Sequence, residues 1–407
     1  MDINSNLQDF ITDCKPCQRC IGRCLATTGS FELNQSLNKF QEIAHFISTN
    51  LPEEEKCEIC EGLVHESLGI VDKLIENISK YDFEDFLVGS NLPKELIDKE
   101  RIFHKYNLKV RTLKQEISRE IGLRISEKLT KPVNFEYPDI TVLISKRKNV
   151  RFELQIKSIY LLGLYNKFER GIPQTKWPCT YCKGKKCAKC NNTGQQYPES
   201  VETLISSHFI ELAKTNSFSF HGAGREDIDA LMLGRGRPFV LEIKNPKARN
   251  LDLDSIVEKI NESSKIKVSS LQYTEKSIVK EIKEQSPDSY KIYRAKAELQ
   301  HPLSEESLNN LKNIENKEVP LKQRTPIRVS HRRGDLIREK KVFSVKVEEV
   351  TDEVIVLQIN AQGGTYIKEF ISGDEGRTIP NISEIINQQI YCKELDVIYV
   401  QSTIFHE

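Results

Sequence analysis

The sequence predicts an α+β protein built in two parts. Three observations support this prediction. Apolar residues recur at helical spacing in the first third of the chain, they alternate with polar residues in several later segments, and ten of the eleven cysteines lie in clusters. With 407 residues, of which 38% are hydrophobic and 29% charged, the chain can bury two or three domain-sized cores.

Membrane insertion and export are not expected. The chain has no apolar run near the roughly 18 residues that a membrane-spanning helix needs, and no signal for secretion or lipidation. We therefore expect a soluble protein of the cytoplasm with no membrane partner.

The N-terminal part is expected to be helical first and then to form a hairpin. Helices are predicted over residues 34–48, 62–81 and 110–129, and a domain boundary near residue 196 separates residues 1–195 from residues 196–407. The third helix carries its apolar stripe on Leu113, Ile117, Ile121, Ile125 and Leu129. Two alternating strands follow, through Ile140, Val142 and Ile144 and through Phe152, Leu154 and Ile156, joined by a basic turn at residues 146–149.

Cysteine spacing predicts two tetrahedral metal sites. In a cytoplasmic chain, paired Cys-x-x-Cys segments indicate zinc rather than disulfides. The first site is expected to join Cys57 and Cys60 to an earlier pair, for which Cys17 with Cys20 is favoured over Cys14 with Cys17. The second site is a compact ribbon of four cysteines, which are Cys179, Cys182, Cys187 and Cys190. Four thiolates leave no open coordination position, so both zinc ions are expected to be structural.

A glycine-hinged loop at residues 221–229 is the first candidate for chemistry. Strands are expected on both sides, through Phe218 and Phe220 before it and from residue 228 onwards after it, so the acids of the loop lie at a strand junction. Glycine permits backbone angles closed to other residues, which suits a loop that presents a side chain at close range. The alternative is a hairpin with solvated charges. Residues 234–236, Gly-Arg-Gly, are predicted to turn the following strand back on itself.

Beyond this loop the pattern is mixed and rich in strands. Helices are expected over residues 254–261 and 276–284, strands over residues 290–299 and 354–361, and a strand-to-helix transition at residues 362–370. The formal net charge is only +1, but basic residues gather in two places. Residues 321–341 hold eight Lys and Arg against two acids, and residues 174–196 hold five Lys and no acid. Such clusters are either solvated faces or phosphate-binding surfaces.

Three of these segments resemble the motifs of pseudouridine synthases, in the same order. They are residues 224–227 (Gly-Arg-Glu-Asp), 291–293 (Lys-Ile-Tyr) and 364–368 (Gly-Thr-Tyr-Ile-Lys). Residues 219–246 and 363–380 resemble in particular the tenth pseudouridine synthase family of archaea and eukaryotes. Cys17, Cys20, Cys57 and Cys60 match the zinc knuckles of that family, and residues 179–190 resemble an insertion of its archaeal members.

This resemblance implies an architecture and an activity. The architecture is an N-terminal zinc-binding module with an RNA-binding THUMP domain, followed by a catalytic domain with a mixed, mainly antiparallel sheet. The activity is that of an isomerase, which converts uridine to pseudouridine in the T loop of tRNA, at position 55, position 54 or both. No cofactor is implied for catalysis, only structural zinc.

The resemblance also assigns roles to residues. Asp227 is the nucleophile or base, Lys368 the cation beside it, Arg225 a group that holds the vacated base stack or a phosphate, and Tyr293 the ring that stacks on the extruded uracil. Without the resemblance, Tyr293 would be interpreted as a half-buried strand aromatic.

Substrate binding is assigned to Tyr366 and to the basic run. The members of that run are Arg328, His331, Arg332, Arg333, Arg338, Lys340 and Lys341, which are expected to contact phosphates. The N-terminal module is expected to hold the acceptor end of the tRNA, with the chain acting as a monomer.

Two other functions compete with this one. Asp227 or Asp229, with Glu242 and Lys244 across a hairpin, resembles the carboxylate arrangement of a metal-dependent nuclease. A non-catalytic, zinc-containing tRNA-binding module would need none of these acids for chemistry.

Overall fold

The computed structural model describes residues 3–26, 51–284 and 289–405. The chain divides into two compact units, residues 1–157 with 245–249 and residues 158–244 with 250–407. Each unit has its own sheet and its own hydrophobic core. The helix expected over residues 34–48 falls outside the described residues. In the described ranges, no helix is both long and apolar enough to span a bilayer.

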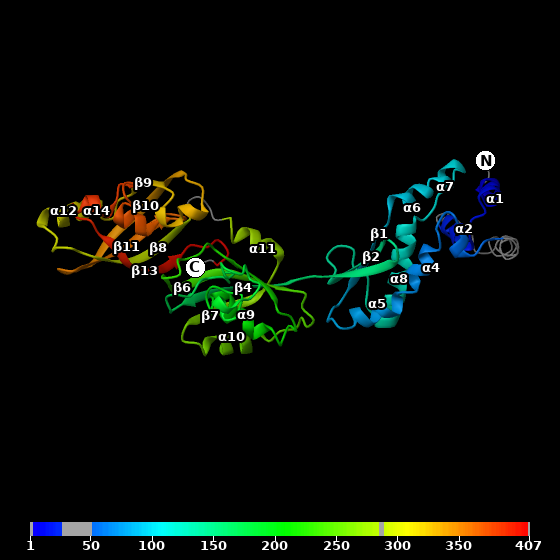
Figure 1. The fold of residues 1–407 in the computed structure, drawn as a ribbon, viewed down its shortest axis with the longest axis horizontal. Coiled ribbons are helices and arrows are strands. Elements are labelled where there is room, and N and C mark those ends of the chain that lie inside the picture. Colours follow the sequence, from blue (N-terminus) through cyan, green and yellow to red (C-terminus); the bar gives the residue numbers. More distant parts are fainter. Residues whose placement is uncertain (1–2, 27–50, 285–288, 406–407) are drawn as a thin grey trace. The chain divides into compact units, whose positions relative to one another are not determined.

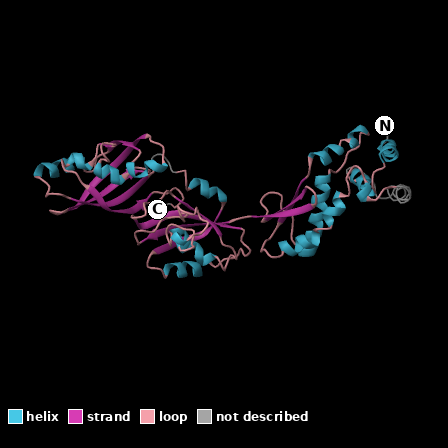
Figure 2. Ribbon diagram, viewed as in Figure 1, coloured by secondary structure: helices cyan, strands magenta, loops and turns pink. Residues whose placement is uncertain are grey.

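The first unit combines short helices with a three-stranded sheet (Figures 1 and 2). Its helices are α1 (Ile3–Cys14), α2 (Gln18–Leu25), η1 (Glu54–Lys56), α4 (Leu63–Leu68), α5 (Val71–Ile78), α6 (Lys94–Lys99), α7 (Ile102–Lys105) and α8 (Leu113–Leu129). Its strands are β1 (Phe86–Asn91), β2 (Ile140–Lys146) and β3 (Val150–Ile156). Strands β1 and β2 pair in parallel, and β2 and β3 form the predicted hairpin.

Helix α8 shows why the periodicity of this unit could be used for prediction. The Thr112 hydroxyl accepts a hydrogen bond from the Gln115 amide at 3.2 Å, and the Gln115 side chain accepts one from the Thr112 amide at 3.0 Å. This capping box fixes where the helix begins. Four residues of the predicted stripe are buried and Leu129 is partly buried, and the helix packs against β1. The helix expected over residues 62–81 is instead divided at Gly69 into α4 and α5, because glycine is a poor helix former.

The second unit is built on a ten-stranded sheet. Its strands are β4 (Ile159–Lys167), β5 (Ser217–Gly222), β6 (Leu231–Lys244), β7 (Ile266–Thr274), β8 (Tyr290–Glu298), β9 (Val319–Arg324), β10 (Ile337–Val350), β11 (Val354–Gln362), β12 (Thr378–Ile379) and β13 (Tyr391–Val400). The strand order is β12-β9-β10-β11-β8-β13-β6-β4-β7, with β5 also paired to β6. Strands β6 and β13 pair in parallel, and the remaining pairings of these strands are antiparallel. The sheet is therefore mixed and mainly antiparallel, as expected.

Short helices border this sheet (Figure 1). They are η2 (Ala188–Cys190), α9 (Val201–Ser206), η3 (Ser207–Phe209), α10 (Leu253–Asn261), α11 (Lys276–Glu281), α12 (Glu305–Ile314), η4 (Ile327–Arg332), α13 (Ile367–Ser372) and α14 (Ile382–Ile385). Helix α13 lies where the strand-to-helix transition was predicted, directly after β11.

The two units separate earlier than the boundary expected near residue 196. The long N-terminal stretch of the first unit ends at Lys157, and β4, which follows at once, lies between β6 and β7 in the sheet of the second unit. Leu161 and Tyr165 of β4 are fully buried in the core of that unit. The second cysteine cluster therefore belongs to the second unit.

The Gly-Arg-Gly segment at residues 234–236 does not turn the chain, so that prediction is wrong. Strand β6 continues through it from Leu231 to Lys244. Both glycines have positive φ, and a Cβ on Gly234 would lie 2.1 Å from the Ile398 carbonyl oxygen. The glycines thus bend one strand: residues 231–232 pair with β13, while later residues pair with β4 and β5.

Candidate active site

Three distant segments of the second unit meet at a pocket of about 150 Å³. The loop after β5 contributes Arg225, Glu226 and Asp227, β8 contributes Lys291 and Tyr293, and the turn into α13 contributes residues 364–368. Residues 328, 329 and 333, in and just after η4, complete the wall. The three motifs that were singled out in the sequence are therefore brought together by the fold.

Glycine shapes the loop that carries Asp227. Gly224 adopts a φ of +73°, in the left-handed region that favours glycine. A Cβ on Gly222 would lie 2.7 Å from Nε2 of Gln174, which donates a hydrogen bond of 3.0 Å to the Gly224 carbonyl. The hydrogen bond from the buried Gln174 side chain therefore holds the backbone of the loop at Gly224.

Two cations flank the Asp227 carboxylate. Arg328 Nη1 lies 3.2 Å from Oδ1 and 3.1 Å from Oδ2 of Asp227. Nε of the same guanidinium donates to Glu369 at 2.6 Å, which fixes its orientation. Lys368 Nζ lies 3.8 Å from Asp227 Oδ2. Both cations therefore lie within ion-pair distance of the Asp227 carboxylate.

Lys368 is shared with a second acid. Its Nζ lies 2.6 Å from Oδ2 of Asp229, closer than to Asp227. Partial burial opposes ionisation of Asp229, but the hydrogen bond and charge of Lys368 outweigh it, so the pKa of Asp229 is lowered. The cation nearest to the Asp227 carboxylate is thus Arg328, which we had expected to contact phosphate, and Lys368 lies farther away.

A buried charged cluster supports the loop from inside. Glu226 points away from solvent, and its Oε2 lies 2.9 Å from Nε of Arg237, which is 1% exposed. The Tyr165 hydroxyl donates a hydrogen bond of 2.8 Å to the same carboxylate. Lys167 Nζ lies 3.9 Å from Glu226 and donates to the carbonyls of Asp227, at 3.4 Å, and Ile228, at 3.1 Å. The loop backbone beside the acid is therefore held by buried cations.

The wall formed by β8 carries an aromatic ring and an amine on one face. Tyr293 is buried and lines the pocket; burial and, to a smaller degree, the Asp227 charge raise its pKa to about 12, so its phenol is protonated at neutral pH. Lys291, two residues earlier, is also buried. Burial, with the neighbouring charge of Arg237, lowers the pKa of Lys291 to about 7.

The residues expected to bind substrate have different surroundings. Tyr366 lines the pocket, and its hydroxyl accepts a hydrogen bond of 2.7 Å from Arg333, which also lies at the pocket. Lys340 donates to the Gly363 carbonyl at 2.9 Å and so holds the turn before α13. The side chain of Arg332 falls outside what the structure describes.

Sequence reasoning missed the cluster beneath the loop. Glu226 and Lys291 lie within the quoted motifs, but neither was given a role, and Arg237 and Lys167 were not considered. Their common signal is burial of a charged side chain, which a single sequence does not report. The sequence hints at this buried cluster only by placing a charged residue at an otherwise apolar position of a strand.

The carboxylate arrangement of a nuclease is not present. Glu242 lies on the opposite face of β6 from Arg237, Phe239 and Leu241. Its oxygens contact His221 at 3.2 Å, Ser158 at 3.1 Å and Tyr160 at 3.3 Å. Glu242 and Lys244 therefore do not join Asp227 or Asp229, and that alternative is wrong.

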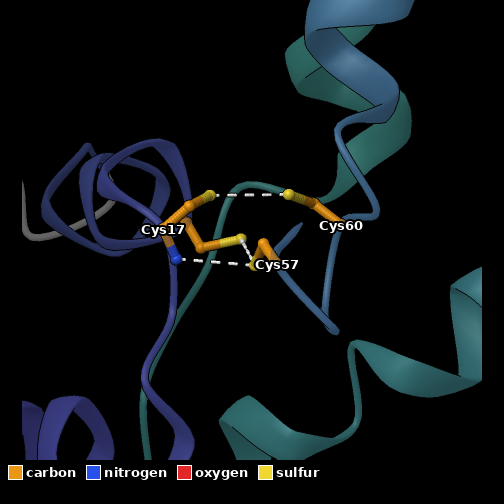
Figure 3. Close-up of side chains that lie close together, drawn as sticks. Cys17, Cys57 and Cys60 are labelled. Atoms are coloured by element: carbon orange, nitrogen blue, oxygen red, sulfur yellow. Dashed lines mark hydrogen bonds between the residues drawn. The ribbon is translucent and has the colours of Figure 1, made fainter. Parts of the chain in front are cut away.

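The first cysteine group assembles as predicted from two helical segments. The thiol sulfurs of Cys17, Cys20, Cys57 and Cys60 lie within 4.8 Å of one another and are buried. Figure 3 shows Cys17 and Cys60 facing each other, with sulfurs 3.5 Å apart. A tetrahedral zinc ion with Zn–S bonds of about 2.3 Å needs sulfurs spaced about 3.8 Å, which this group nearly provides. The structure thus selects the pair Cys17 and Cys20 over Cys14 and Cys17.

The second cysteine group is complete within twelve residues of the second unit. Cys179, Cys182, Cys187 and Cys190 also have sulfurs within 4.8 Å of one another. The backbone amides of Cys187 and Gly194 point at the Cys190 sulfur, at 3.3 Å and 3.2 Å. Amide donors of this kind stabilise a thiolate, so the donor set fits zinc. Each group offers four cysteine sulfurs, enough to fill a tetrahedral coordination shell, which fits structural ions.

Two family models match the chain, one mainly in each unit. Residues 160–401 match the family model described as "Pus10, C-terminal". Residues 70–145 match the model described as "Pus10 THUMP domain, archaeal". The first model covers more than half of the chain.

Curated archaeal proteins are similar over nearly the full length. A protein of Methanothermobacter marburgensis named "tRNA pseudouridine synthase Pus10" is 38% identical over 98% of this chain and 99% of its own length. Proteins of the same name from Methanocaldococcus jannaschii and Methanosphaera stadtmanae are 44% and 40% identical, over 86% and 85% of this chain and 76% and 89% of their own lengths.

Proposed function

This chain belongs to the Pus10 family of tRNA pseudouridine synthases, which are isomerases, and we propose that it converts uridine to pseudouridine in the T loop of tRNA, at position 55, position 54 or both. The proposal rests on one observation above all. The Asp227 carboxylate lies in the pocket between two cations, Arg328 and Lys368, with the Tyr293 ring on the wall.

The reaction needs little beyond this arrangement. The bond between N1 of uracil and C1′ of the ribose breaks, the base turns, and a bond forms between C5 and C1′. The proton on C5 leaves and N1 gains one, so there is no redox change, no hydrolysis and no cofactor. A single ionised carboxylate suffices as the nucleophile or base, and we assign that role to Asp227.

The neighbours of Asp227 supply charge and shape. Arg328, oriented by Glu369, forms an ion pair with the carboxylate at the wall of the pocket. The protonated Tyr293 presents a ring face on which an extruded uracil can stack. Arg225 is exposed at the mouth, where its guanidinium can occupy the gap left in the RNA stack.

The polynucleotide would be held by charge and by the first unit. Arg333 and Tyr366 line the pocket and would contact the nucleotide that enters it, while the other basic residues of the run, apart from Arg328, would contact phosphates. The THUMP domain would hold the acceptor end, and two distant contacts together would measure the shape of a tRNA. Binding should therefore weaken steeply with added salt; an affinity indifferent to salt would contradict the phosphate contacts.

The test is a direct assay of the product. Purified protein is incubated with an unmodified tRNA transcript in the absence of divalent metal, and pseudouridine is mapped by carbodiimide labelling and primer extension. We expect stops in the T loop that are absent with Asp227→Asn. Asp352→Asn, which neutralises an exposed acid of the same unit, is the matched control and should leave the stops unchanged.

Other outcomes point elsewhere. Strand scission that depends on magnesium would indicate a nuclease, against the geometry at Glu242. Tight tRNA binding without either product would indicate a passive zinc-containing module. Full activity of Asp227→Asn would refute the catalytic role of Asp227.

Arg328 gives a second test of the same site. Arg328→Met removes the closest charge partner of Asp227, so we expect single-turnover rates to fall by about a hundredfold, the usual effect of removing one strong electrostatic contact at a reacting centre. Arg328→Lys should recover part of this loss. Equal rates for Arg328→Met and the unsubstituted enzyme would contradict the assignment.

A further inference from the structure

The second cysteine cluster stands at the rim of the candidate active site. Residues 173–177 lead into it, and Pro173, Thr175 and Trp177 line a hollow of about 210 Å³ together with Asp227 and Lys368. The ribbon, defined here as residues 178–195, therefore begins immediately beside the acid that we assign to catalysis.

The base of the ribbon is fixed to the rest of the unit. Gln174 is 9% exposed and donates to the Tyr165 hydroxyl at 2.8 Å as well as to the active-site loop. The amide of Glu202 in α9 donates to the Gln174 carbonyl at 2.9 Å, and the Glu202 side chain accepts from the Lys176 amide at 3.1 Å. The position of the ribbon relative to the pocket is thus built into the fold.

The ribbon itself is a closed structure. Its two ends meet where the amide of Gln196 donates to the Trp177 carbonyl at 2.9 Å and that of Cys179 donates to Gly194 at 2.8 Å. The four cysteines described above lie together inside the ribbon, where a bound metal ion would link them. A short segment of this kind has no apolar core, so its side chains are free to project outward.

The side chains that project outward from the ribbon are positively charged or aromatic. Lys183, Lys185, Lys186 and Lys189 are all exposed. As far as the described residues go, none of the four takes part in an ion pair. Tyr181 is 70% exposed, and the Lys189 ammonium lies 3.5 Å from the centroid of its ring.

A structural zinc site does not need these exposed lysines and this tyrosine. Four ammonium groups within seven residues repel one another, and an acid between them would relieve the repulsion, yet residues 174–196 contain none. A bound polyanion would relieve the repulsion between the ammonium groups equally well. An exposed tyrosine beside lysines also offers a stacking platform for an unpaired base, which is typical of proteins that bind single-stranded nucleic acid.

We propose that the ribbon is a further RNA-binding element, which binds the phosphates and one unstacked base of the substrate strand next to the nucleotide held in the pocket. This inference rests on the proposed function, since it takes the substrate to be tRNA. It adds an RNA contact that neither the THUMP domain nor the basic run at residues 321–341 provides.

The test compares two triple variants that lose the same net charge. Lys185→Ala/Lys186→Ala/Lys189→Ala removes positive charge from the ribbon. Lys259→Ala/Lys276→Ala/Lys312→Ala removes it from exposed positions on α10, α11 and α12 of the same unit. Dissociation constants for a tRNA transcript are measured at several salt concentrations, with both variants also carrying Asp227→Asn so that no product forms.

We expect the ribbon variant to bind roughly tenfold more weakly and to show a shallower salt dependence, with a log–log slope reduced by about one for each phosphate that a lysine no longer neutralises. The control variant should differ from Asp227→Asn alone by less than about twofold. Equal affinities and slopes for the two variants would overturn the proposal. Because the lysines are exposed, circular dichroism and zinc content should be unchanged in both.

Tyr181 separates stacking from charge. Tyr181→Phe should retain affinity, whereas Tyr181→Ala should bind about tenfold more weakly, the effect of one base–aromatic stack. Pseudouridine mapping with Asp227 intact distinguishes failure of this inference from failure of the proposed function. A T loop that the unsubstituted enzyme leaves unmodified refutes the proposed function, whereas a modified T loop with unaltered binding of the ribbon variant refutes only the role of the ribbon.

Discussion

Replacement of Glu226 by glutamine tests whether the buried charged cluster sustains the second unit. The substitution keeps the shape of the side chain and removes its charge. Arg237, which is 1% exposed, then has no carboxylate at its Nε, and Lys167 loses the anion 3.9 Å away. Burial lowers the pKa of Lys167, whereas the guanidinium of Arg237 stays charged. The destabilisation therefore falls on Arg237.

The expected magnitude follows from that single uncompensated charge. Removing one partner of a buried ion pair costs about 3–5 kcal/mol in the free energy of unfolding. With a urea m-value of about 2.5 kcal/mol/M, the midpoint should fall by roughly 1.5 M. The double variant Glu226→Gln/Arg237→Met should recover much of the loss, because no charge remains unpaired.

The sequence offers a convenient probe for this measurement. Trp177 is the only tryptophan of the chain and lies in the second unit, so its fluorescence reports the unfolding of that unit whatever the first unit does. Glu339→Gln, at an exposed position of β10, is the control and should change stability by less than about 0.5 kcal/mol. A loss below about 1 kcal/mol for Glu226→Gln would refute the reasoning.

Three further predictions concern other parts of the molecule. Lys291 has a pKa of about 7 in the folded protein, below the ordinary 10.5, so the unfolded chain binds more protons between these pH values and the free energy of unfolding should rise with pH there. Urea unfolding should show a gain of about 2 kcal/mol from pH 7 to pH 9, and Lys291→Met should abolish that gain. A gain that persists in Lys291→Met would contradict the assignment to Lys291. Gly234→Ala would place a Cβ 2.1 Å from the Ile398 carbonyl oxygen and should cost at least about 3 kcal/mol by the same assay, whereas Gly334→Ala, with no atom within 4 Å, should be neutral. Cys57→Ser should lower the zinc content measured by atomic absorption from two ions per chain to one; unchanged content would exclude Cys57 as a ligand.

Local signals explain what could be predicted from the sequence. The stripe on α8, the hairpin of β2 and β3, and the loop before Asp227 depend on residues that are close in sequence, so a single chain displays them. The cysteine knuckles are equally local, although the choice between Cys14 and Cys20 required the fold.

The errors arise where distant segments decide the outcome. The glycines at residues 234–236 resemble a turn, but their reason is the close approach of the Ile398 carbonyl from β13. Strand β4 follows β3 after two residues, yet it pairs with β6 and β7. Arg328 resembles any other member of its basic run until η4 places it against Asp227. In each case the deciding partner is far along the chain.

The charges around Asp227 also decide between two chemistries that a carboxylate can perform. A metal-dependent nuclease needs carboxylate oxygens that face a common point and remain open to a divalent ion. Both oxygens of Asp227 instead lie within 3.2 Å of Arg328, a cation that cannot lose its proton, and Lys368 occupies the next position at 3.8 Å. A divalent ion would have to displace the guanidinium against its own charge. The charges around Asp227 therefore favour the proposed rearrangement, in which the carboxylate acts without a metal ion, over metal-dependent cleavage.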